Sequence, residues 1–542
     1  MKSLLALLVA LTIGQTSLAA SARPNILFFF VDDWGRYASI YADPQQPSLN
    51  DIVKTPNFDR IGREGVVFEN AFVPVSSCGP CRASLATGRY FWNCGSGAFL
   101  NGKASDWTGH ENPFPAMTKF PDLLRESGYF ARKQVKTISF VDSKQTPIEN
   151  SMPRVKYQRY GLYVSEAKDD ADRAKRIEET LKHPRYEMRR VVEAALSVEQ
   201  PFFFIYGTIN VHRPYKADSG QKLWGINPAS LRGRLPKFIP DVEDARRDFA
   251  DYLGEVQAAD AMLGVMLDEL EKAGQLDNTL VIISGDNGIP GVPRGKTNCY
   301  DLSARAPMMV RLPGKVQAGR RVKDFVSVMD VGPTLLEVAG LPVPADMNGC
   351  SFLAQLTSPK SGWIDEKRDW VVVGRELHFP TARDGNLPFP MRAIRTKEHL
   401  YIHNFKPDRW PYGAPYNLDD KSTAGDYEKL EEAPYRDLDA SLTKSWLIDN
   451  RSATDAKDAI ELTLGKRPPE ELYAIKNDPD SLYNLEGDSN AENTLEELRT
   501  RLDTVMQETN DPRLTDAFDN PPYVVDPAKV SAQKPKSRKK QK

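Results

Sequence analysis

The sequence is poor in the features that mark several classes of protein. It has 5 cysteines and 6 histidines among 542 residues, which is too little cysteine for a disulfide-rich scaffold. Its 72 basic and 74 acidic residues give a net charge of −2, so the chain as a whole has no excess charge to attract nucleic acid or a membrane surface. Hydrophobic residues make up 40% and charged residues 27% of the chain, as in ordinary globular proteins. This composition excludes a fibrous or wholly disordered chain.

Both ends of the chain are predicted to lie outside the fold. Residues 1–22 have one basic residue, Lys2, then an apolar run from Leu4 to Gly14, and then small residues. This pattern indicates a secretory signal peptide, because the apolar run is shorter than the roughly 20 residues that span a bilayer. We therefore expect an exported protein, periplasmic or secreted, without stable membrane insertion. Residues 511–542 end in a basic stretch and are expected to form an extended, disordered tail.

Strands and helices are predicted to alternate along residues 23–365. Asn25–Val31 and Phe202–Gly207 are unbroken apolar runs, which is typical of strands buried on both faces of a parallel sheet. Asp244–Ala273 has the period of a long amphipathic helix. Other predicted elements are helices at Asn57–Glu64, Phe120–Ser127, Glu187–Ser197 and Asp330–Ala339, and strands at Val66–Phe72, Tyr129–Val135, Thr279–Ser284 and Pro307–Leu312. This alternation predicts an α/β fold with a large, mostly parallel sheet between layers of helices.

Residues 366–510 are predicted to form a smaller subdomain. Short strand-like pieces at Trp370–Val373, Arg392–Arg395 and Leu400–Phe405 are separated by loops rich in proline and glycine. A helix is expected near Leu495–Met506. This order of elements predicts a C-terminal antiparallel sheet.

Two polar pairs follow predicted strands directly. Asp32 and Asp33 come after the first strand, and Asp286 and Asn287 come after the strand that begins at Thr279. Ligands of parallel α/β sheets lie beyond the carboxyl ends of the strands, so both pairs can converge at one edge. A single such pair is more often a turn or a helix cap. Two pairs with oxygen ligands and no sulfur favour a hard cation, Ca²⁺ or Mg²⁺.

The stretch from Cys78 to Gly88 is the most informative part of the chain. Cys78-Gly-Pro-Cys81 has the C-x-x-C spacing of a redox dithiol, and a zinc knuckle would need a second Cys or His pair that the sequence lacks. A third interpretation takes Cys78-x-Pro80-x-Arg82 with the following Ala-Ser-Leu-x-Thr-Gly. This pattern resembles the signature of the type I sulfatases. Arg82 has no role in dithiol exchange, which favours the sulfatase interpretation over the redox one.

The resemblance extends from about Pro24 to Leu485 and thus covers nearly the whole predicted mature chain. It implies an alkaline-phosphatase-like sandwich with a catalytic domain at 23–365 and hydrolysis of sulfate groups. It also implies that a maturation enzyme oxidises Cys78 to formylglycine. One hydroxyl of the hydrated aldehyde would attack sulfur, and the other would lose its proton and expel sulfate, restoring the aldehyde.

The resemblance also assigns roles to single residues. Arg82, one helical turn after position 78, would hold the hydrated aldehyde, and Lys136 and Lys296 would contact the sulfate. His212 would protonate the leaving oxygen. The family favours Ca²⁺ over Mg²⁺, bound by the two strand-end pairs and by position 78. Arg294 is an alternative to Lys296 for the second cationic contact.

The chain departs from the usual family pattern at three places. Cys81 stands where the family usually has serine, and Val135 stands where glycine usually precedes the lysine. The family normally has a histidine two or three residues after that lysine, where this chain has Ile138 and Ser139.

The C-terminal part resembles the branch of the family that includes heparan N-sulfatase. The segment Gly374-Arg-Glu-Leu-His378 carries this resemblance together with residues 390–404. Arg375, Glu376, His378 and Arg383 are predicted to line a sugar pocket, with Arg375 and His378 as substrate contacts. We expect a sulfated glycan or oligosaccharide as the substrate, with an N- or O-linked sulfate.

Two other functions fit the same motifs. One is a phosphonate or phosphodiester hydrolase that shares the Cys-x-Pro-x-Arg signature. Hydrolases that resemble this type have histidine where this chain has Asn287, which argues against this alternative. The other is an inactive relative that binds glycans. Ile138 and Ser139 favour this alternative, because they stand where the family normally has a histidine.

Overall fold

The computed structural model of the protein describes residues 23–100, 105–143, 159–415, 418, 434–454 and 456–525. The expected signal peptide at residues 1–22 lies outside the described residues. Among the helices that the structure describes, none is both long and apolar enough to cross a membrane.

The central element is a seven-stranded sheet with the strand order β3-β4-β1-β5-β6-β2-β7. Its strands are β1 (Asn25–Val31), β2 (Val66–Phe72), β3 (Phe130–Val135), β4 (Phe202–Gly207), β5 (Thr279–Gly285), β6 (Arg305–Arg311) and β7 (Arg320–Ser327). β6 pairs antiparallel with both of its neighbours, and the other pairs are parallel. The prediction of a mixed, mostly parallel sheet is confirmed.

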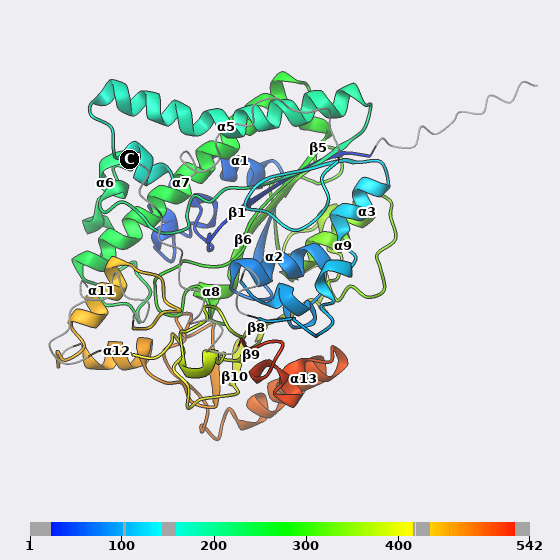
Figure 1. Ribbon diagram of the computed structural model, residues 1–542. Coiled ribbons are helices and arrows are strands. Elements are labelled where there is room, and N and C mark those ends of the chain that lie inside the picture. The colour runs from blue at the N-terminus through cyan, green and yellow to red at the C-terminus, as the bar shows by residue number, and fades with distance from the viewer. Residues whose placement is uncertain are drawn as a thin grey trace, which may run out of the picture.

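Helices cover both faces of this sheet, as Figure 1 shows. The helices are α1 (Pro56–Arg63), α2 (Cys78–Thr87), α3 (Phe120–Glu126), α4 (Tyr160–Val164), α5 (Asp170–Ser197), α6 (Ser219–Trp224), α7 (Glu243–Lys272), α8 (Asp301–Ala304), α9 (Val331–Val338), α10 (Leu353–Thr357), α11 (Leu442–Asp449), α12 (Lys457–Leu464) and α13 (Glu492–Glu508). Alternate residues of β1 enter different cores: Phe28 packs with side chains of α2, α3 and α9, and Phe29 packs with those of α1, α5 and α7. A strand buried on both faces is what the unbroken apolar run predicts.

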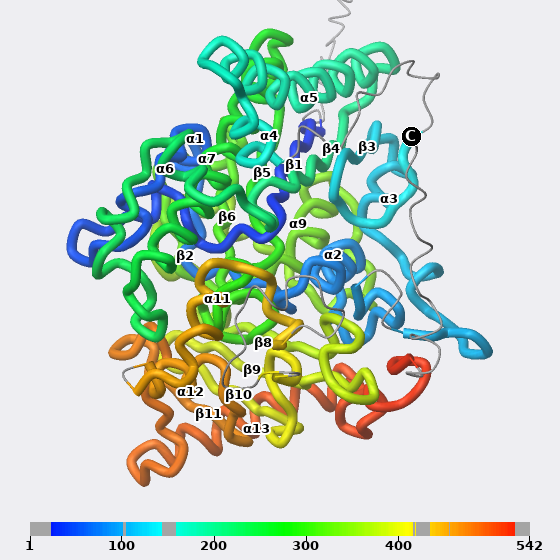
Figure 2. Tube along the Cα trace, turned by 60° about the vertical axis from the view of Figure 1, so that its left-hand side comes forward, coloured from blue at the N-terminus to red at the C-terminus, as the bar shows by residue number. Residues whose placement is uncertain are grey.

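A second, antiparallel sheet has the order β11-β10-β9-β8. Its strands are β8 (Trp370–Arg375), β9 (Met391–Thr396), β10 (His399–Asn404) and β11 (Glu470–Ala474). Figure 2 shows this yellow-to-red part of the chain on one side of the blue-to-green sheet. The two parts share one hydrophobic core, in which Val373 and Ile394 belong to the same cluster as Phe28. The backbone N–H of Gly374 also donates to the carbonyl of Pro74, four residues before Cys78.

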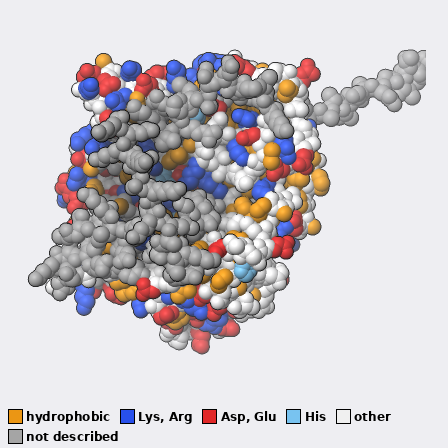
Figure 3. Space-filling model, viewed as in Figure 1, with side chains coloured by type: hydrophobic (Ala, Val, Ile, Leu, Met, Phe, Trp, Pro, Cys, Tyr) orange, Lys and Arg blue, Asp and Glu red, His pale blue; other side chains and the backbone are white. Residues whose placement is uncertain are grey.

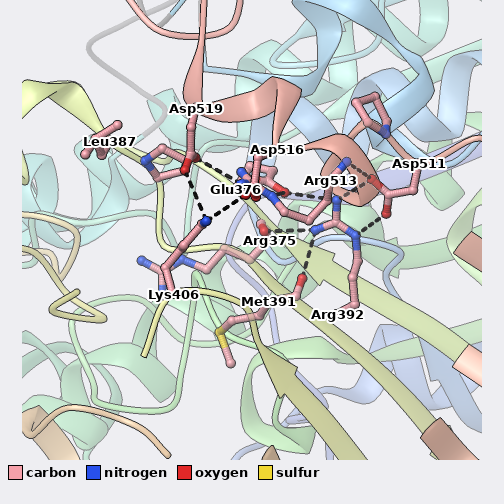
Figure 4. Close-up of polar contacts among 12 residues, drawn as sticks. Arg375, Glu376, Leu387, Met391, Arg392, Lys406, Asp511, Arg513, Asp516 and Asp519 are labelled. Carbon is pink, nitrogen blue, oxygen red and sulfur yellow. Dashed lines mark hydrogen bonds and ion pairs between the residues drawn. The ribbon is translucent and has the colours of Figure 1, made fainter. Parts of the chain in front are cut away.

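The prediction of an extended, disordered tail from residue 511 is wrong for residues 511–525. This segment has two short helical turns, and Asp511, Arg513 and Phe518 are buried. Figure 4 shows the charged side chains that attach it to the second sheet. Arg392 of β9 binds Asp511 through two hydrogen bonds of 2.6 and 2.9 Å, and Arg513 binds Glu376 at 2.5 Å. Charged residues that pair inside the protein show no apolar periodicity, so the sequence pattern did not predict that this segment is buried.

Candidate active site

The two strand-end pairs meet because β1 and β5 are adjacent and parallel. The backbone N–H of Asp33 donates to Oδ1 of Asp286 at 2.8 Å, and Nδ2 of Asn287 donates to Oδ1 of Asp33 at 2.8 Å. All four side chains, including that of Asp32, are fully buried. The structure therefore brings together the four residues that the sequence offers as metal ligands.

The chemistry of this group fits a hard divalent cation. Oδ1 of Asn287 is buried and has no hydrogen-bond partner among the described residues. Burial raises the pKa of Asp286 to about 7, although Arg82 acts in the other direction. Burial also acts against the charge of Asp32, but Lys136 and Arg82 outweigh it and hold the pKa of that carboxyl below its ordinary value. Three buried carboxylates and one unpaired amide oxygen form an oxygen-rich donor set of the kind that Ca²⁺ and Mg²⁺ prefer.

Cys78 is the first residue of α2, at the same edge of the sheet. Its sulfur and one carboxylate oxygen each of Asp32 and Asp286 all lie within 4.8 Å of one another. Burial raises the pKa of the Cys78 thiol, although Lys296 and Lys136 lower it, and burial also raises the pKa of Cys81. A redox dithiol needs a thiol whose pKa is lowered, so these buried cysteines lack the activation of a thioredoxin-like pair.

Three cationic side chains surround Cys78 and the carboxylates. Arg82 donates to Oδ2 of Asp286 at 2.9 Å and to the backbone carbonyl of Lys136 at 2.6 Å. The ammonium of Lys136 lies 2.7 Å from Oδ2 of Asp32. The ammonium of Lys296 lies 2.8 Å from Oδ1 of Asp33. Each cation is oriented by a buried carboxylate, so the group can bind an anion without large rearrangement. In Figure 3, Lys and Arg side chains gather in a hollow near the middle of the visible face.

His212 follows β4 and faces the same group. Its Nδ1 donates to the backbone carbonyl of Arg213 at 2.6 Å, which leaves Nε2 directed towards Asp33, 3.8 Å from the carboxylate. About a quarter of its side chain is exposed, at 26%. The ring is thus held by one nitrogen and open at the other, as a proton donor to a bound molecule must be.

Residues with left-handed backbone immediately precede two of these side chains. Val135, before Lys136, has φ = 66°, and Val211, before His212, has φ = 89°. β-Branched residues rarely adopt positive φ, and such strain concentrates at functional sites. Val135 occupies the position where the family usually has glycine. This chain therefore has left-handed backbone at this position without glycine, the residue that adopts it most easily.

The residues predicted to line a sugar pocket separate into two groups. Nδ1 of His378 lies 2.9 Å from Oγ of Ser77, the residue before Cys78. Burial, together with the charge of Lys296, lowers the pKa of His378 to about 3, so its imidazole is neutral. The structure does not bring Arg375 to the carboxylate group, because it is buried and pairs with Asp437 at 2.9 Å.

The other two residues of that prediction are also held within the C-terminal part. Arg383 pairs with Asp437 at 2.7 Å, and Glu376 pairs with Arg392 and Arg513. Arg294, the alternative to Lys296, is buried and hydrogen-bonds to backbone carbonyls of Asp480 and Ser481. Among these residues, His378 is the one whose contacts reach the start of α2.

Three residues near the site were missed by the sequence analysis. Ser77 contacts His378, Asp439 lies 4.0 Å from the ammonium of Lys296, and Asp248 binds Arg213 through two hydrogen bonds. Ser77 could have been suggested by its position beside Cys78. Asp439 lies far along the chain in a polar stretch, and no local pattern distinguishes it from other acidic residues.

A model of the sulfatase family matches residues 24–341, which is more than half of the chain. The chain belongs to the sulfatase family. As a sulfatase it is a sulfuric ester hydrolase. A second family model, for the C-terminal domain of N-sulphoglucosamine sulphohydrolase, matches residues 295–411 of this sulfatase. The predicted resemblance to the heparan N-sulfatase-like branch is confirmed.

Curated relatives agree with this assignment. An ulvan-active sulfatase of Formosa agariphila is 26% identical over 529 residues, covering 90% of this chain and 75% of that protein. N-sulphoglucosamine sulphohydrolase of Homo sapiens is 28% identical over 453 residues, covering 77% and 82%.

The solved structures support the fold. A structure from a study of glycosaminoglycan metabolism by Bacteroides thetaiotaomicron has a TM-score of 0.58 at 18% identity, covering 91% of this chain and 98% of that one. Another, in complex with D-glucosamine-2-N,6-O-disulfate, has a TM-score of 0.54 at 17% identity, covering 92% and 100%.

Proposed function

We propose that this sulfatase removes O-sulfate or N-sulfo groups from a sulfated glycan or oligosaccharide. The observation that carries the proposal is the position of Cys78 at the start of a buried helix, close to carboxylate oxygens of Asp32 and Asp286. Arg82, Lys136 and Lys296 add positive charge around it. Relatives named for activity on ulvan and on N-sulphoglucosamine support a carbohydrate as the class of substrate.

Position 78 would act as the nucleophile after a maturation enzyme has converted its cysteine to formylglycine. The hydrated aldehyde supplies one hydroxyl that attacks sulfur and a second whose loss of a proton releases the sulfate. The N-terminus of α2 favours negative charge at this position. Arg82 lies one turn further along the helix and fixes the carboxylates of Asp32 and Asp286 around it.

Lys136 and Lys296 would bind the sulfate oxygens. Each ammonium has three N–H groups and uses some of them on Asp32 or Asp33, so others remain for the substrate. When both ring nitrogens carry a proton, His212 would give the proton on Nε2 to the leaving oxygen or nitrogen, while its Nδ1–H stays bound to a backbone carbonyl. Each of these residues therefore has a separate task in binding or proton transfer.

Replacing His212 by alanine should reduce turnover most for substrates with poor leaving groups. A positioned acid contributes about 10²–10⁴-fold to a step that needs a proton, whereas an activated aryl sulfate leaves without one. The measurement is kcat for an alkyl or sugar sulfate against kcat for an aryl sulfate. His110→Ala, at an exposed position, is the control. Equal losses on both substrates would remove His212 from the role of acid.

We infer that the cation is Ca²⁺, bound by Asp32, Asp33, Asp286, Asn287 and position 78. When bound, it would stabilise negative charge on the sulfate oxygens. The support is the oxygen donor set and the unpaired amide oxygen of Asn287. The family resemblance favours Ca²⁺ over Mg²⁺.

Removal of the cation with a chelator should abolish activity and lower Tm, because a ligand that binds the native state alone stabilises it. Ca²⁺ should restore both better than Mg²⁺. Asp286→Ala should lose the metal in elemental analysis and show no rise in Tm on addition of Ca²⁺. Asp458→Ala, at an exposed position of α12, should behave as the parent protein. A chelated protein with unchanged Tm and activity would contradict the metal assignment.

The test of the proposed function is release of free sulfate from defined sulfated oligosaccharides, with mass spectrometry of the peptide that contains Cys78. We expect sulfate release and conversion of the thiol to an aldehyde. A strong preference for phosphodiesters would favour the phosphodiester hydrolase instead. An unmodified Cys78 with glycan binding and no turnover would favour a non-catalytic relative.

We also propose that the protein is exported, to the periplasm or outside the cell. The support is the pattern of residues 1–22, with one basic residue, a short apolar run and small residues. Sequencing of the N-terminus of the protein from its host should find the chain beginning near residue 23.

A further inference from the structure

A cavity of about 500 Å³ is lined by Arg213, the residue that follows His212 in the chain. Its walls come from the segment that begins at Arg213, from α7, and from residues 434–448, which include α11. Tyr215 and Phe379 supply aromatic surface, and several charged side chains supply polar surface. Concave sites of this kind, with aromatic walls and a few polar groups, are typical of small-ligand binding.

The charged groups of this cavity differ in whether they have partners. Arg213 and Asp248 form a pair with two hydrogen bonds of 2.7 and 2.9 Å, and Asp248 also accepts from Thr443 at 2.7 Å. The ammonium of Lys444 donates to the backbone carbonyls of Tyr435 and Leu438. These groups hold the wall together and have little capacity left for a ligand.

Asp439 is different. Its carboxylate lies 4.0 Å from the ammonium of Lys296, and among the described residues its side chain makes no hydrogen bond. Its side chain is 19% exposed, and it lines the cavity. Asp439 is therefore an acceptor at the boundary between the cavity and the cationic group that would hold the sulfate.

This placement determines which sugars fit. Lys296 and His212 both face the carboxylate of Asp33, at 2.8 and 3.8 Å, and Arg213, the residue after His212, lines the cavity. A sugar whose sulfate is bound at Lys296 can therefore extend past His212 into the cavity. A sugar in the cavity then presents its hydroxyl or amino groups to Asp439, which can only accept while it is ionised. A sugar carboxylate at the same place would face the like charge of Asp439.

We propose that this cavity binds the sugar that carries the scissile sulfate, that Asp439 accepts hydrogen bonds from its hydroxyl or amino groups, and that Asp439 selects against a uronate at this position. The proposal rests on the proposed function, because it uses the sulfate contact of Lys296 to orient the sugar. It assigns Asp439 as a residue that determines specificity within that site.

The test compares Asp439→Asn with the parent protein on three substrates: a sulfated glucosamine, a 2-O-sulfated uronate and an aryl sulfate. For the parent we expect kcat/KM to be higher on the sulfated glucosamine than on the uronate. In the variant, kcat/KM for the glucosamine should fall about 10- to 100-fold, mainly through KM, which is the range for loss of a hydrogen bond to a charged group. The ratio of glucosamine to aryl sulfate activity should fall with it, and the preference over the uronate should shrink.

Asp458→Asn is the matched control, because it makes the same change at an exposed position of the same part of the chain. Losses of equal size on the glucosamine and the aryl sulfate would overturn the proposal, since Asp439 would then act through Lys296 alone. A parent protein that prefers the uronate would also overturn it.

A binding measurement separates this proposal from the proposed function. Calorimetric titration of Cys78→Ala with the sulfated glucosamine, with and without Asp439→Asn, should show Kd weaker by at least tenfold in the double variant. If the parent hydrolyses no sulfate but Kd responds in this way, the cavity assignment stands and the proposed reaction fails. An unchanged Kd would overturn the cavity assignment even if sulfate is released.

Discussion

Cys78→Ala is expected to lower sulfate release by about 10³-fold or more, because it removes the nucleophile and not merely a binding contact. The side chain is 5% exposed and lies beside Asp32 and Asp286, so no other side chain can take its place without rearrangement of the helix start. The measurement is free sulfate from a sulfated oligosaccharide. Binding of the substrate should persist, since Lys136 and Lys296 are retained.

Two further variants make this prediction specific. Cys78→Ser has one hydroxyl, so it should become sulfated and turn over no further, which intact mass spectrometry would detect. Cys81→Ser introduces the residue that the family usually has, and it should retain activity. If Cys81→Ser were as inactive as Cys78→Ala, the two thiols would have to act together, and the sulfatase chemistry at position 78 would be refuted.

Arg392→Ala is expected to cost about 3–5 kcal/mol of the free energy of unfolding, the range for removal of one partner from a buried ion pair. Arg392 is fully buried, binds Asp511 through two hydrogen bonds and pairs with Glu376 at 3.0 Å (Figure 4). Without it, Asp511 loses its guanidinium partner inside the protein. Urea denaturation measures the loss.

Arg392→Met and Arg499→Ala are the controls for this result. The methionine fills much of the space, so a loss similar to that of Arg392→Ala would assign the effect to charge rather than to a cavity. Arg499 pairs with Glu470 at 2.7 Å on a partly exposed surface, where such pairs contribute about 0–1 kcal/mol. Equal effects of Arg392→Ala and Arg499→Ala would mean that the buried network does not hold the C-terminal segment.

The sequence predicted those strands and helices whose hydrophobic pattern is clear. The apolar runs became β1, β4 and β5. Apart from α5, which begins at Asp170 rather than at Glu187, the predicted helices formed with ends that shifted by a few residues. β7 was missed because its strand contains buried charge: Arg320 donates to backbone carbonyls, and Asp324 accepts backbone N–H groups of another segment. The first half of α5 was missed because its residues are mostly charged and Pro184 lies within the helix.

The candidate site was predictable to the extent that it lies at strand ends and in the helix that begins at Cys78. Asp32 and Asp286 follow adjacent parallel strands, and topology alone brings them together. Contacts between distant segments were not predictable. The contact of His378 with Ser77 spans 301 residues, and it depends on how the second sheet packs against the first.

The backbone bond between Gly374 and Pro74 has a consequence for the order of events during synthesis. Residues 74–88 leave the ribosome long before β8 exists, whereas in the finished protein β8 meets the turn before Cys78 and the thiol is 5% exposed. The maturation enzyme proposed for Cys78 would have its best access to the thiol during that interval. On the proposed mechanism, the timing of chain growth, rather than the final shape, would then decide whether each molecule becomes active.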